Sequence, residues 1–346
     1  MPLITPELKI LFLETTLACN LHCKHCRQNK SSIGKDHKDL SFAQIKILID
    51  QVLSFARPFI VLSGGEPLLR EDIFQIAEYI KDRKLKVGLA TNAVLINEFK
   101  SSQIKKSGID IVSVSIDSID ENTHDSFRGS KGAFQAALKG INFLKKLNIP
   151  FQINTAATKQ NAGKLDEIVE FSKKLGARAL HVFVLVPVGC AKEISPDQIL
   201  GPEECEELLL QIAHLQNKNV FDIRPTCAPF FTRIKDFNGQ HLDKASGCLA
   251  GKSIIFVSAK GEVYPCGYFD YSLANIEDQD LKSIWQENKD LKLLRDPSKL
   301  KGKCGVCEYK VCCGGCRAKA FAKYGDFLAQ DPVCSYLPAV YTTRAK

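Results

Sequence analysis

Three cysteines near the start of the chain, Cys19, Cys23 and Cys26, have a spacing that suits a metal cluster. They are separated by three residues and then by two. A cubane 4Fe–4S cluster normally takes four cysteine ligands, so a compact site with three leaves one iron free to bind another group. Zinc matches less well, because it needs a fourth ligand and its cysteines usually come as two closely spaced pairs. The spacing therefore predicts an iron–sulfur cluster with one open iron.

A Gly-Gly-Glu-Pro segment at 64–67 follows a short apolar run that we interpret as a buried strand. Gly64 and Gly65 let the backbone approach a ligand closely, and Glu66 supplies an acceptor. Polar residues also follow three later strands: they are Thr91, Asn92, Ser115, Asp117 and Asn154. The carboxyl ends of strands in a parallel barrel share one rim, where active sites lie, so we expect these residues to surround a common ligand.

The C-terminal third of the chain holds a second set of cysteines. They are Cys227, Cys248, Cys266, Cys304, Cys307, Cys312, Cys313, Cys316 and Cys334. This density indicates further metal sites, and the alternative is a zinc knuckle built from the two pairs with two-residue spacing. We interpret Cys190 and Cys205 as ordinary thiols.

The bulk composition of the 346 residues is that of a globular protein, with 45% hydrophobic and 25% charged residues. No apolar run approaches the length of a membrane span, and the start of the chain lacks a secretory signal, so we expect a cytoplasmic protein with reduced thiols. The net charge of +8 arises from 47 basic and 39 acidic residues, with no dense basic arm for nucleic acid. A mild basic excess favours an anionic small substrate.

Short apolar runs alternate with amphipathic stretches from residue 10 to about residue 217. We expect strands at 11–14, 59–62, 86–90, 111–116, 151–154 and 181–186, with Ser41 capping the first intervening helix and Pro202 beginning the last. This alternation predicts an α/β protein with a partial (β/α)6 TIM-like barrel, and a doubly wound open sheet is the alternative. We expect the barrel at 1–217 and a cysteine-rich domain at 218–346.

The three-cysteine loop together with the Gly-Gly-Glu-Pro segment resembles the signature of the radical S-adenosylmethionine (SAM) enzymes. This resemblance implies that the open iron chelates SAM, that 64–66 grip its amino group, and that Ser115 and Asp117 face its ribose. Arg128 could then reach a carboxylate of SAM or of the substrate. His22 and His25, inside the cysteine loop, are expected to shield the cluster.

The C-terminal cysteines resemble the SPASM extension of radical SAM enzymes, which holds auxiliary 4Fe–4S clusters. The pattern supplies seven thiolates and Cys227 is the natural eighth, so we favour two auxiliary clusters over one. The resemblance implies one ligand set of Cys227, Cys248, Cys266 and Cys316, and another of Cys304, Cys307, Cys313 and Cys334. Cys312 is the alternative to Cys313.

Longer stretches, among them 181–189, 226–229 and 301–309, resemble the heme synthase family of the siroheme-dependent heme pathway. The resemblance implies oxidative decarboxylation of two propionates of iron-coproporphyrin III to vinyl groups, giving heme b, with a low-potential donor such as ferredoxin or flavodoxin. Arg224 and Arg233 are candidate partners for the substrate carboxylates. The alternatives are another SPASM enzyme (a didecarboxysiroheme deacetylase, a heme d1 enzyme or a peptide modifier) and an iron–sulfur or zinc protein without catalysis.

Overall fold

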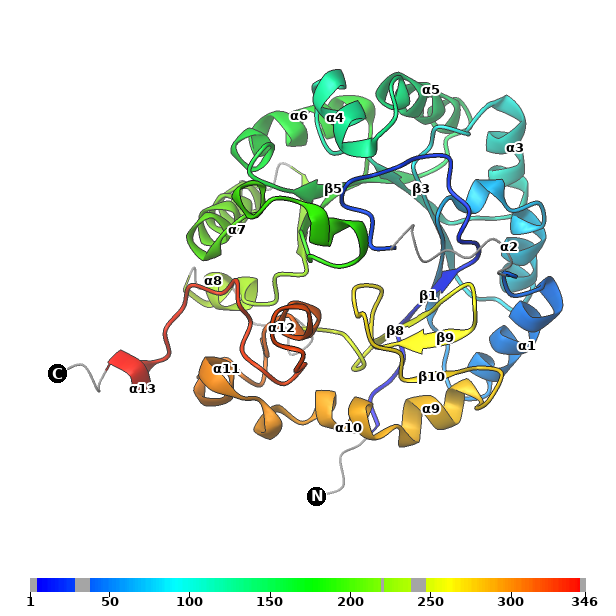
Figure 1. Cartoon of the computed structure of the whole chain (residues 1–346). Coiled ribbons are helices and arrows are strands. Elements are labelled where there is room, and N and C mark those ends of the chain that lie inside the picture. The colour runs from blue at the N-terminus through cyan, green and yellow to red at the C-terminus, as the bar shows by residue number, and fades with distance from the viewer. Residues whose placement is uncertain (1–4, 29–37, 219–220, 238–246, 343–346) are drawn as a thin grey trace.

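The computed structural model describes residues 5–28, 38–218, 221–237 and 247–342. One ten-stranded sheet forms its centre, in the order β10-β9-β8-β1-β2-β3-β4-β5-β6-β7. The sheet curves around the middle of the molecule, and the helices form a ring outside it (Figure 1). The expected α/β fold with a partial barrel is therefore confirmed.

The strands and helices have the following bounds. The strands are β1 Ile10–Glu14, β2 Phe59–Ser63, β3 Val87–Thr91, β4 Ile111–Ser115, β5 Phe151–Ala157, β6 Ala179–Val184, β7 Asp222–Thr226, β8 Ile254–Val257, β9 Glu262–Tyr264 and β10 Ala274–Asn275. The helices are α1 Phe42–Leu53, α2 Ile73–Asp82, α3 Glu98–Lys106, α4 Glu121–Arg128, α5 Ala133–Lys146, α6 Leu165–Leu175, α7 Pro202–Asn217, α8 Phe231–Phe237, α9 Leu281–Glu287, α10 Lys289–Arg295, α11 Gly302–Val306, α12 Arg317–Tyr324 and α13 Ala339–Thr342.

Local sequence signals explain where the barrel helices begin and end. Ser41 caps α1 in a capping box, because its side chain accepts from the amide of Gln44 while the Gln44 side chain accepts from the amide of Ser41. Pro202 opens α7, where a proline costs no helical hydrogen bond. Gly176 ends α6 in the left-handed conformation that glycine adopts without strain. The expected cap at Ser41 and the helix start at Pro202 are both confirmed.

The strand order distinguishes the two topologies that the sequence left open. Strands β1 to β7 are parallel neighbours in chain order. A doubly wound sheet would reverse its order at a switch point, which is absent along β1 to β7. Sequential order with right-handed crossovers places every connecting helix on the same side, as in a barrel. The side of the sheet that these helices do not cover is the inner face of the barrel.

The sheet continues past residue 217 at both of its edges. Strand β7 pairs with β6, and β8 pairs with β1, in each case in parallel. Strands β9 and β10 then extend that edge as antiparallel neighbours. One hydrophobic core also joins barrel residues such as Leu11 to Trp285, Cys313 and Cys316. The cysteine-rich region is thus built onto the barrel sheet, and the boundary at 217/218 stays a prediction.

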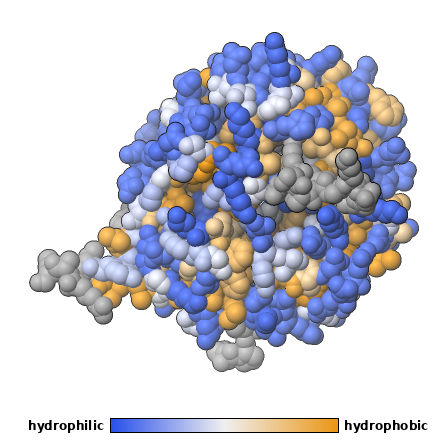
Figure 2. Space-filling view, in the orientation of Figure 1, coloured by the Kyte–Doolittle hydropathy of each residue, from blue (hydrophilic) through white to orange (hydrophobic). Residues whose placement is uncertain are grey.

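The face in view is mainly hydrophilic at its rim, with hydrophobic side chains visible between the polar ones (Figure 2). Among the helices of the described residues, none combines the length and the apolar character that crossing a bilayer requires.

Candidate active site

The loop that carries Cys19, Cys23 and Cys26 follows β1 and lies against the segment after β2. The amide of Gly65 donates to the carbonyl of Thr16 and the amide of Glu66 to that of Ala18, both at 2.7 Å. A Cβ atom on Gly64 would lie 2.7 Å from the Thr16 oxygen, and one on Gly65 would lie 2.3 Å from the Ala18 oxygen. Only glycine allows this approach. The Gly-Gly-Glu segment therefore holds the first half of the cysteine loop.

Two more glycines hold the rest of the cysteine loop. The loop forms backbone hydrogen bonds to the end of α4, from His22 to Arg128 and from Lys24 to Phe127. A Cβ on Gly129 would lie 2.3 Å from the His22 oxygen, and one on Gly189 would lie 2.2 Å from the Arg27 oxygen. The loop is thus fixed by close backbone contacts from the ends of β2 and α4 and from the segment after β6.

Glu66 faces the end of β3 in this structure. Its fully buried carboxylate accepts from the Thr91 hydroxyl at 2.7 Å, the Asn92 amide at 2.8 Å and the Leu68 amide at 3.1 Å. Burial raises the pKa of Glu66, and these three hydrogen bonds oppose that rise. The Asn92 side chain in turn donates to Asn20 of the cysteine loop at 2.8 Å. Glu66, Thr91 and Asn92 therefore lie together, as expected, and join two strand ends to the loop.

A buried charged group lies beside Cys23. Arg128 forms an ion pair with Asp117 at 2.7 Å, and its other terminal nitrogen is 3.8 Å from the Cys23 sulfur. His25 stacks on Phe127 with ring centroids 4.1 Å apart, and its Nε2 is 3.7 Å from Asp117. Burial lowers the pKa of His25 to about 4, so this ring is neutral near pH 7. His25 Nδ1 and Arg128 Nε have no hydrogen-bond partner among the described residues, so one ring nitrogen and one guanidinium donor are available here for a bound group.

The inner face of β4 to β7 is polar and partly exposed. Alternate residues of a strand point to opposite faces, and Ser115, Asn154 and His181 lie on the face away from the helices. Gln152 donates to Asn154 at 3.1 Å and lies 3.2 Å from His181. Arg224 is the register partner of His181 on β7, so both side chains lie on this face. Arg224 is exposed and pairs with Asp222 at 2.7 Å.

Arg233, the second candidate for substrate carboxylates, lies elsewhere. It belongs to α8, is buried, and pairs with Glu206 of α7. Its guanidinium also stacks over Tyr336. The structure thus places Arg224 on the inner face and Arg233 among helices of the outer layer.

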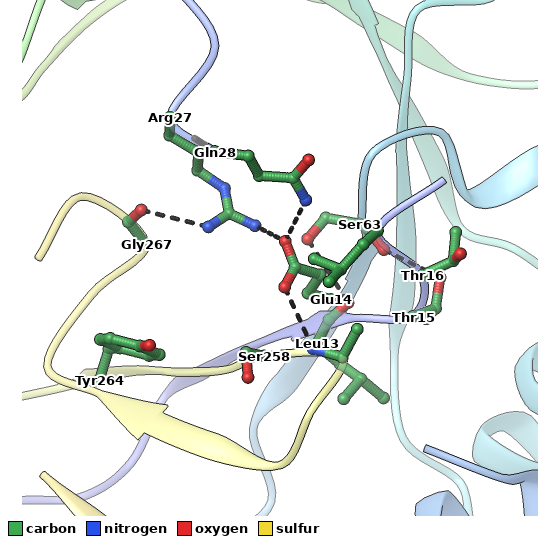
Figure 3. Close-up of polar contacts among 12 residues, drawn as sticks. Leu13, Glu14, Thr15, Thr16, Arg27, Gln28, Ser63, Ser258, Tyr264 and Gly267 are labelled. Carbon is green, nitrogen blue, oxygen red and sulfur yellow. Dashed lines mark hydrogen bonds and ion pairs between the residues drawn. The ribbon is translucent and has the colours of Figure 1, made fainter. Parts of the chain in front are cut away.

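A carboxylate at the end of β1, Glu14, holds the last part of the cysteine loop (Figure 3). Glu14 is buried and binds the Arg27 guanidinium, the Gln28 side chain at 2.7 Å and the Ala259 amide at 3.1 Å. Arg27 also stacks over Phe256 at 4.1 Å and contacts the Gly267 carbonyl at 3.5 Å. We call Glu14, Arg27 and Gln28 the Glu14 clamp. It ties the residues after Cys26 to the β8–β9 region, beside a cavity of about 160 Å³.

The cysteines of the first C-terminal set, Cys227, Cys248, Cys266 and Cys316, lie near one another. The Cys227 and Cys316 thiols are hydrogen-bonded to each other, and this bond together with burial raises the pKa of Cys316 well above its usual value. Burial also raises the pKa of Cys266, and the neighbouring Cys248 and Cys316 thiols add to the rise. Cys227 has φ +60, a left-handed conformation that costs a residue with a side chain energy and is typical of functional sites.

The cysteines of the second set, Cys304, Cys307, Cys313 and Cys334, all lie in the lining of one cavity. Cys312 is not among the residues that line it; the Cys312 thiol donates to the Tyr309 carbonyl at 3.5 Å. The two sets adjoin, because the Cys248 amide donates to the Cys313 carbonyl at 3.0 Å. This geometry favours Cys313 over Cys312.

The donor chemistry of these sites fits iron–sulfur clusters. Thiolates are the ligands that such clusters prefer, and nearby iron would favour the deprotonated form that burial alone disfavours. Among the described residues, no three Cys, His, Asp or Glu side chains meet around one point that could hold a single metal ion.

Several residues at these sites were not identified from the sequence. Glu14 and Arg27 are close only in three dimensions, and Cys190 donates its amide to the Cys26 carbonyl at 2.9 Å. Glu14 could have been identified from the sequence, because it is a charged residue at the end of a strand predicted to be buried. Cys205 is a buried residue of α7, and burial raises its pKa to about 11, in line with an ordinary thiol.

Comparisons with known proteins agree with this arrangement. Residues 13–172 match the radical SAM superfamily model, and residues 248–314 match an iron–sulfur cluster-binding domain known as SPASM. An AdoMet-dependent heme synthase of Methanosarcina barkeri is 40% identical over 95% of this chain and 97% of its own. One of Nitratidesulfovibrio vulgaris is 35% identical over 96% and 94%. The structure of Streptococcus suis SuiB bound to S-adenosylmethionine is similar in fold, with a TM-score of 0.78 and 19% identity over 96% of this chain and 78% of that one.

Proposed function

Because this chain belongs to the radical SAM superfamily, with a SPASM domain and in the family of the AdoMet-dependent heme synthases, we propose that it converts iron-coproporphyrin III to heme b. The observation that carries the proposal is the near-full-length similarity to heme synthases, which includes both cysteine-rich regions. The sites described above are consistent with it.

The proposed reaction removes two propionate carboxyl groups, one at a time. Each propionate loses a hydrogen atom from its β-carbon, then releases CO2 and one electron as the vinyl double bond forms. The cluster and SAM at Cys19, Cys23 and Cys26 would supply the radical that takes the hydrogen atom, while an auxiliary cluster would accept the electron. The chain must therefore hold SAM, substrate and acceptor close together.

We assign the SAM site to the rim around the cysteine loop. The backbone of Gly64 and Gly65 lies against the loop, while Glu66, Thr91 and Asn92 brace it from the end of β3. Asp117 and Arg128 lie on the opposite side of the loop, next to Cys23. Ser115 and Asn154 point to the inner face, where ribose hydroxyls would find acceptors.

We assign two auxiliary clusters to the two sets of four cysteines. The set of Cys227, Cys248, Cys266 and Cys316 lies next to β7 and β9, and the set of Cys304, Cys307, Cys313 and Cys334 surrounds the adjoining cavity. For the substrate carboxylates, the inner-face position of Arg224 favours it over the buried Arg233. We further propose a ferredoxin or flavodoxin as electron donor and a reducing, cytoplasmic setting.

An anaerobic assay of the cluster-loaded protein tests the proposal. With SAM, a reductant and iron-coproporphyrin III, we expect two CO2 per porphyrin and the appearance of heme. The C19A/C23A/C26A variant should cleave no SAM while keeping its auxiliary iron. SAM cleavage without porphyrin turnover would reject the heme synthase function and favour another SPASM reaction, on a different tetrapyrrole or on a peptide.

A further inference from the structure

Helix α12 carries a lysine that is almost completely enclosed by protein. Lys319 is 1% exposed and is one of the largest fully buried side chains of the chain. Its Nζ donates to the Cys227 carbonyl at 3.0 Å, and no carboxylate of the described residues lies within ion-pair distance of it. Lysines are almost never fully buried unless a negative group compensates their charge, because desolvation of an ammonium is costly. Among the described residues, this cation therefore has no directly paired carboxylate.

The surroundings of Lys319 identify the missing negative group. Among the described residues, its hydrogen bond is to the backbone of Cys227, and the helix that carries it, α12, directly follows Cys316, the N-cap residue. Both cysteines belong to the set to which we assign an auxiliary cluster. In Figure 1, α12 lies on the inner side of α10 and α11. A cluster held by four thiolates carries net negative charge, which a buried ammonium would compensate.

We propose that Lys319 is a redox-tuning residue that raises the reduction potential of the cluster held by Cys227, Cys248, Cys266 and Cys316. The inference rests on the proposed function, in which an auxiliary cluster accepts the electron released on decarboxylation. Adding an electron makes the cluster more negative, so a fixed cation nearby stabilises the reduced form more than the oxidised form. The raised reduction potential would make this cluster the acceptor of the electron released on decarboxylation.

The neighbouring cluster site has a different charge environment. Arg317, also buried, places a terminal nitrogen 3.8 Å from the Cys304 sulfur and donates to the carbonyls of Phe327 and Ala329. The fully buried Asp331 lies between the two sets: its amide donates to the same sulfur at 3.3 Å, and its carboxylate accepts from the Cys316 amide at 2.7 Å. Asp331 thus contributes negative charge to both sets, and Arg317 offsets it at the second set. Lys319, whose Nζ donates to the Cys227 carbonyl, is the buried lysine of α12 that lies against the first set.

Redox titration of the cluster-loaded protein, followed by electron paramagnetic resonance, tests this inference. We expect Lys319→Met to lower the reduced-to-oxidised ratio of one auxiliary cluster about tenfold at fixed potential. For one electron this is a shift of about 59 mV to lower potential. Lys319→Arg should keep the potential close to the wild-type value because it keeps the positive charge. Lys323→Met is the matched control: it removes the same charge from an exposed position on the same helix and should leave the potential unchanged.

Iron content and spectral intensity show whether each variant still assembles its clusters. Should Lys319→Met lose the cluster, Lys319→Gln decides, because glutamine can still donate to the Cys227 carbonyl while lacking charge. Wild-type potentials in the Met and Gln variants would overturn the role of Lys319. A wild-type protein that fails to decarboxylate iron-coproporphyrin III would instead reject the proposed function, and the potential measurements would remain valid on their own.

Discussion

The Glu14 clamp allows a quantitative prediction about the cysteine loop. In Glu14→Ala, the Arg27 guanidinium and the Gln28 side chain lose their shared acceptor, and the Ala259 amide is left without a partner. Arg27 and Gln28 directly follow Cys26, so the loop end should become less ordered while the sheet remains intact. We therefore expect reduced stability together with partial loss of the cluster at the three-cysteine loop.

The magnitude follows from the exposure of two of the partners, the Ala259 amide and the Arg27 side chain. The Ala259 amide is fully buried, and leaving such a donor unpaired costs about 1–3 kcal/mol. The Arg27 side chain is 24% exposed, so water compensates part of the lost ion pair and its contribution is about 1 kcal/mol. Together these terms predict a loss of about 3 kcal/mol in the free energy of unfolding. Glu14→Gln keeps one acceptor oxygen and should lose less.

Denaturant unfolding of the loaded protein measures the change, and iron analysis with electron paramagnetic resonance reports the loop cluster. Glu207→Ala is the matched control, since Glu207 is exposed and its removal should change stability by less than about 0.5 kcal/mol. If Glu14→Ala unfolds like that control and keeps all of its loop cluster, the clamp has no structural role and the reasoning is wrong.

Three further predictions follow from other sites. Gly65→Ala forces the Ala18 carbonyl away from its position, so the rate of SAM cleavage should fall about a hundredfold. Gly163→Ala is the control and should cleave SAM normally, because a Cβ added there meets nothing within 4 Å. Equal rates in the two variants would refute the importance of the Gly65 contact. Cys313→Ser should lose auxiliary iron and Cys312→Ser should retain it, as measured by iron and sulfide content, and the reverse result would exchange their roles. Burial, with Arg224 adding to it, lowers the pKa of His181 from 6.5 to about 4, so the unfolded chain takes up a proton first as the pH falls. Between pH 7 and pH 5 this should cost about 2 kcal/mol of stability, and unfolding of His181→Asn should lack that part of the pH dependence.

The barrel was largely predictable because its signals are local. Apolar runs of strand length, a serine before an amphipathic helix and a glycine after one depend on neighbouring residues only, and the helix face of Ile45, Leu48, Ile49 and Val52 is buried. The extension of the sheet by β7 and β8 was not predicted. These strands are short and pair with β6 and β1 across long stretches of chain, so nothing local indicates their partners.

Some features of the site were also predictable from local sequence, whereas others depend on contacts between distant residues. Glycines at 64, 65 and 129 stand where two backbones touch, and motif spacing indicated the first two. The partners of buried charges were not accessible from the sequence, because a charged residue in a pattern carries no information about what surrounds it. Asp117 thus pairs with Arg128, and Arg233 pairs with Glu206 of another helix.

The sequence by itself determined the kind of chemistry, since the spacing of Cys19, Cys23 and Cys26 limits which metal group three thiols on one loop can hold. It also determined the parallel α/β architecture through periodicity. Only the tertiary structure decided which downstream cysteines meet, which of Cys312 and Cys313 lines the cavity, and that Lys319 lies buried beside Cys227. The reason is that burial and electrostatic neighbourhood arise from contacts between distant parts of the chain, and such contacts exist only once the sheet has assembled.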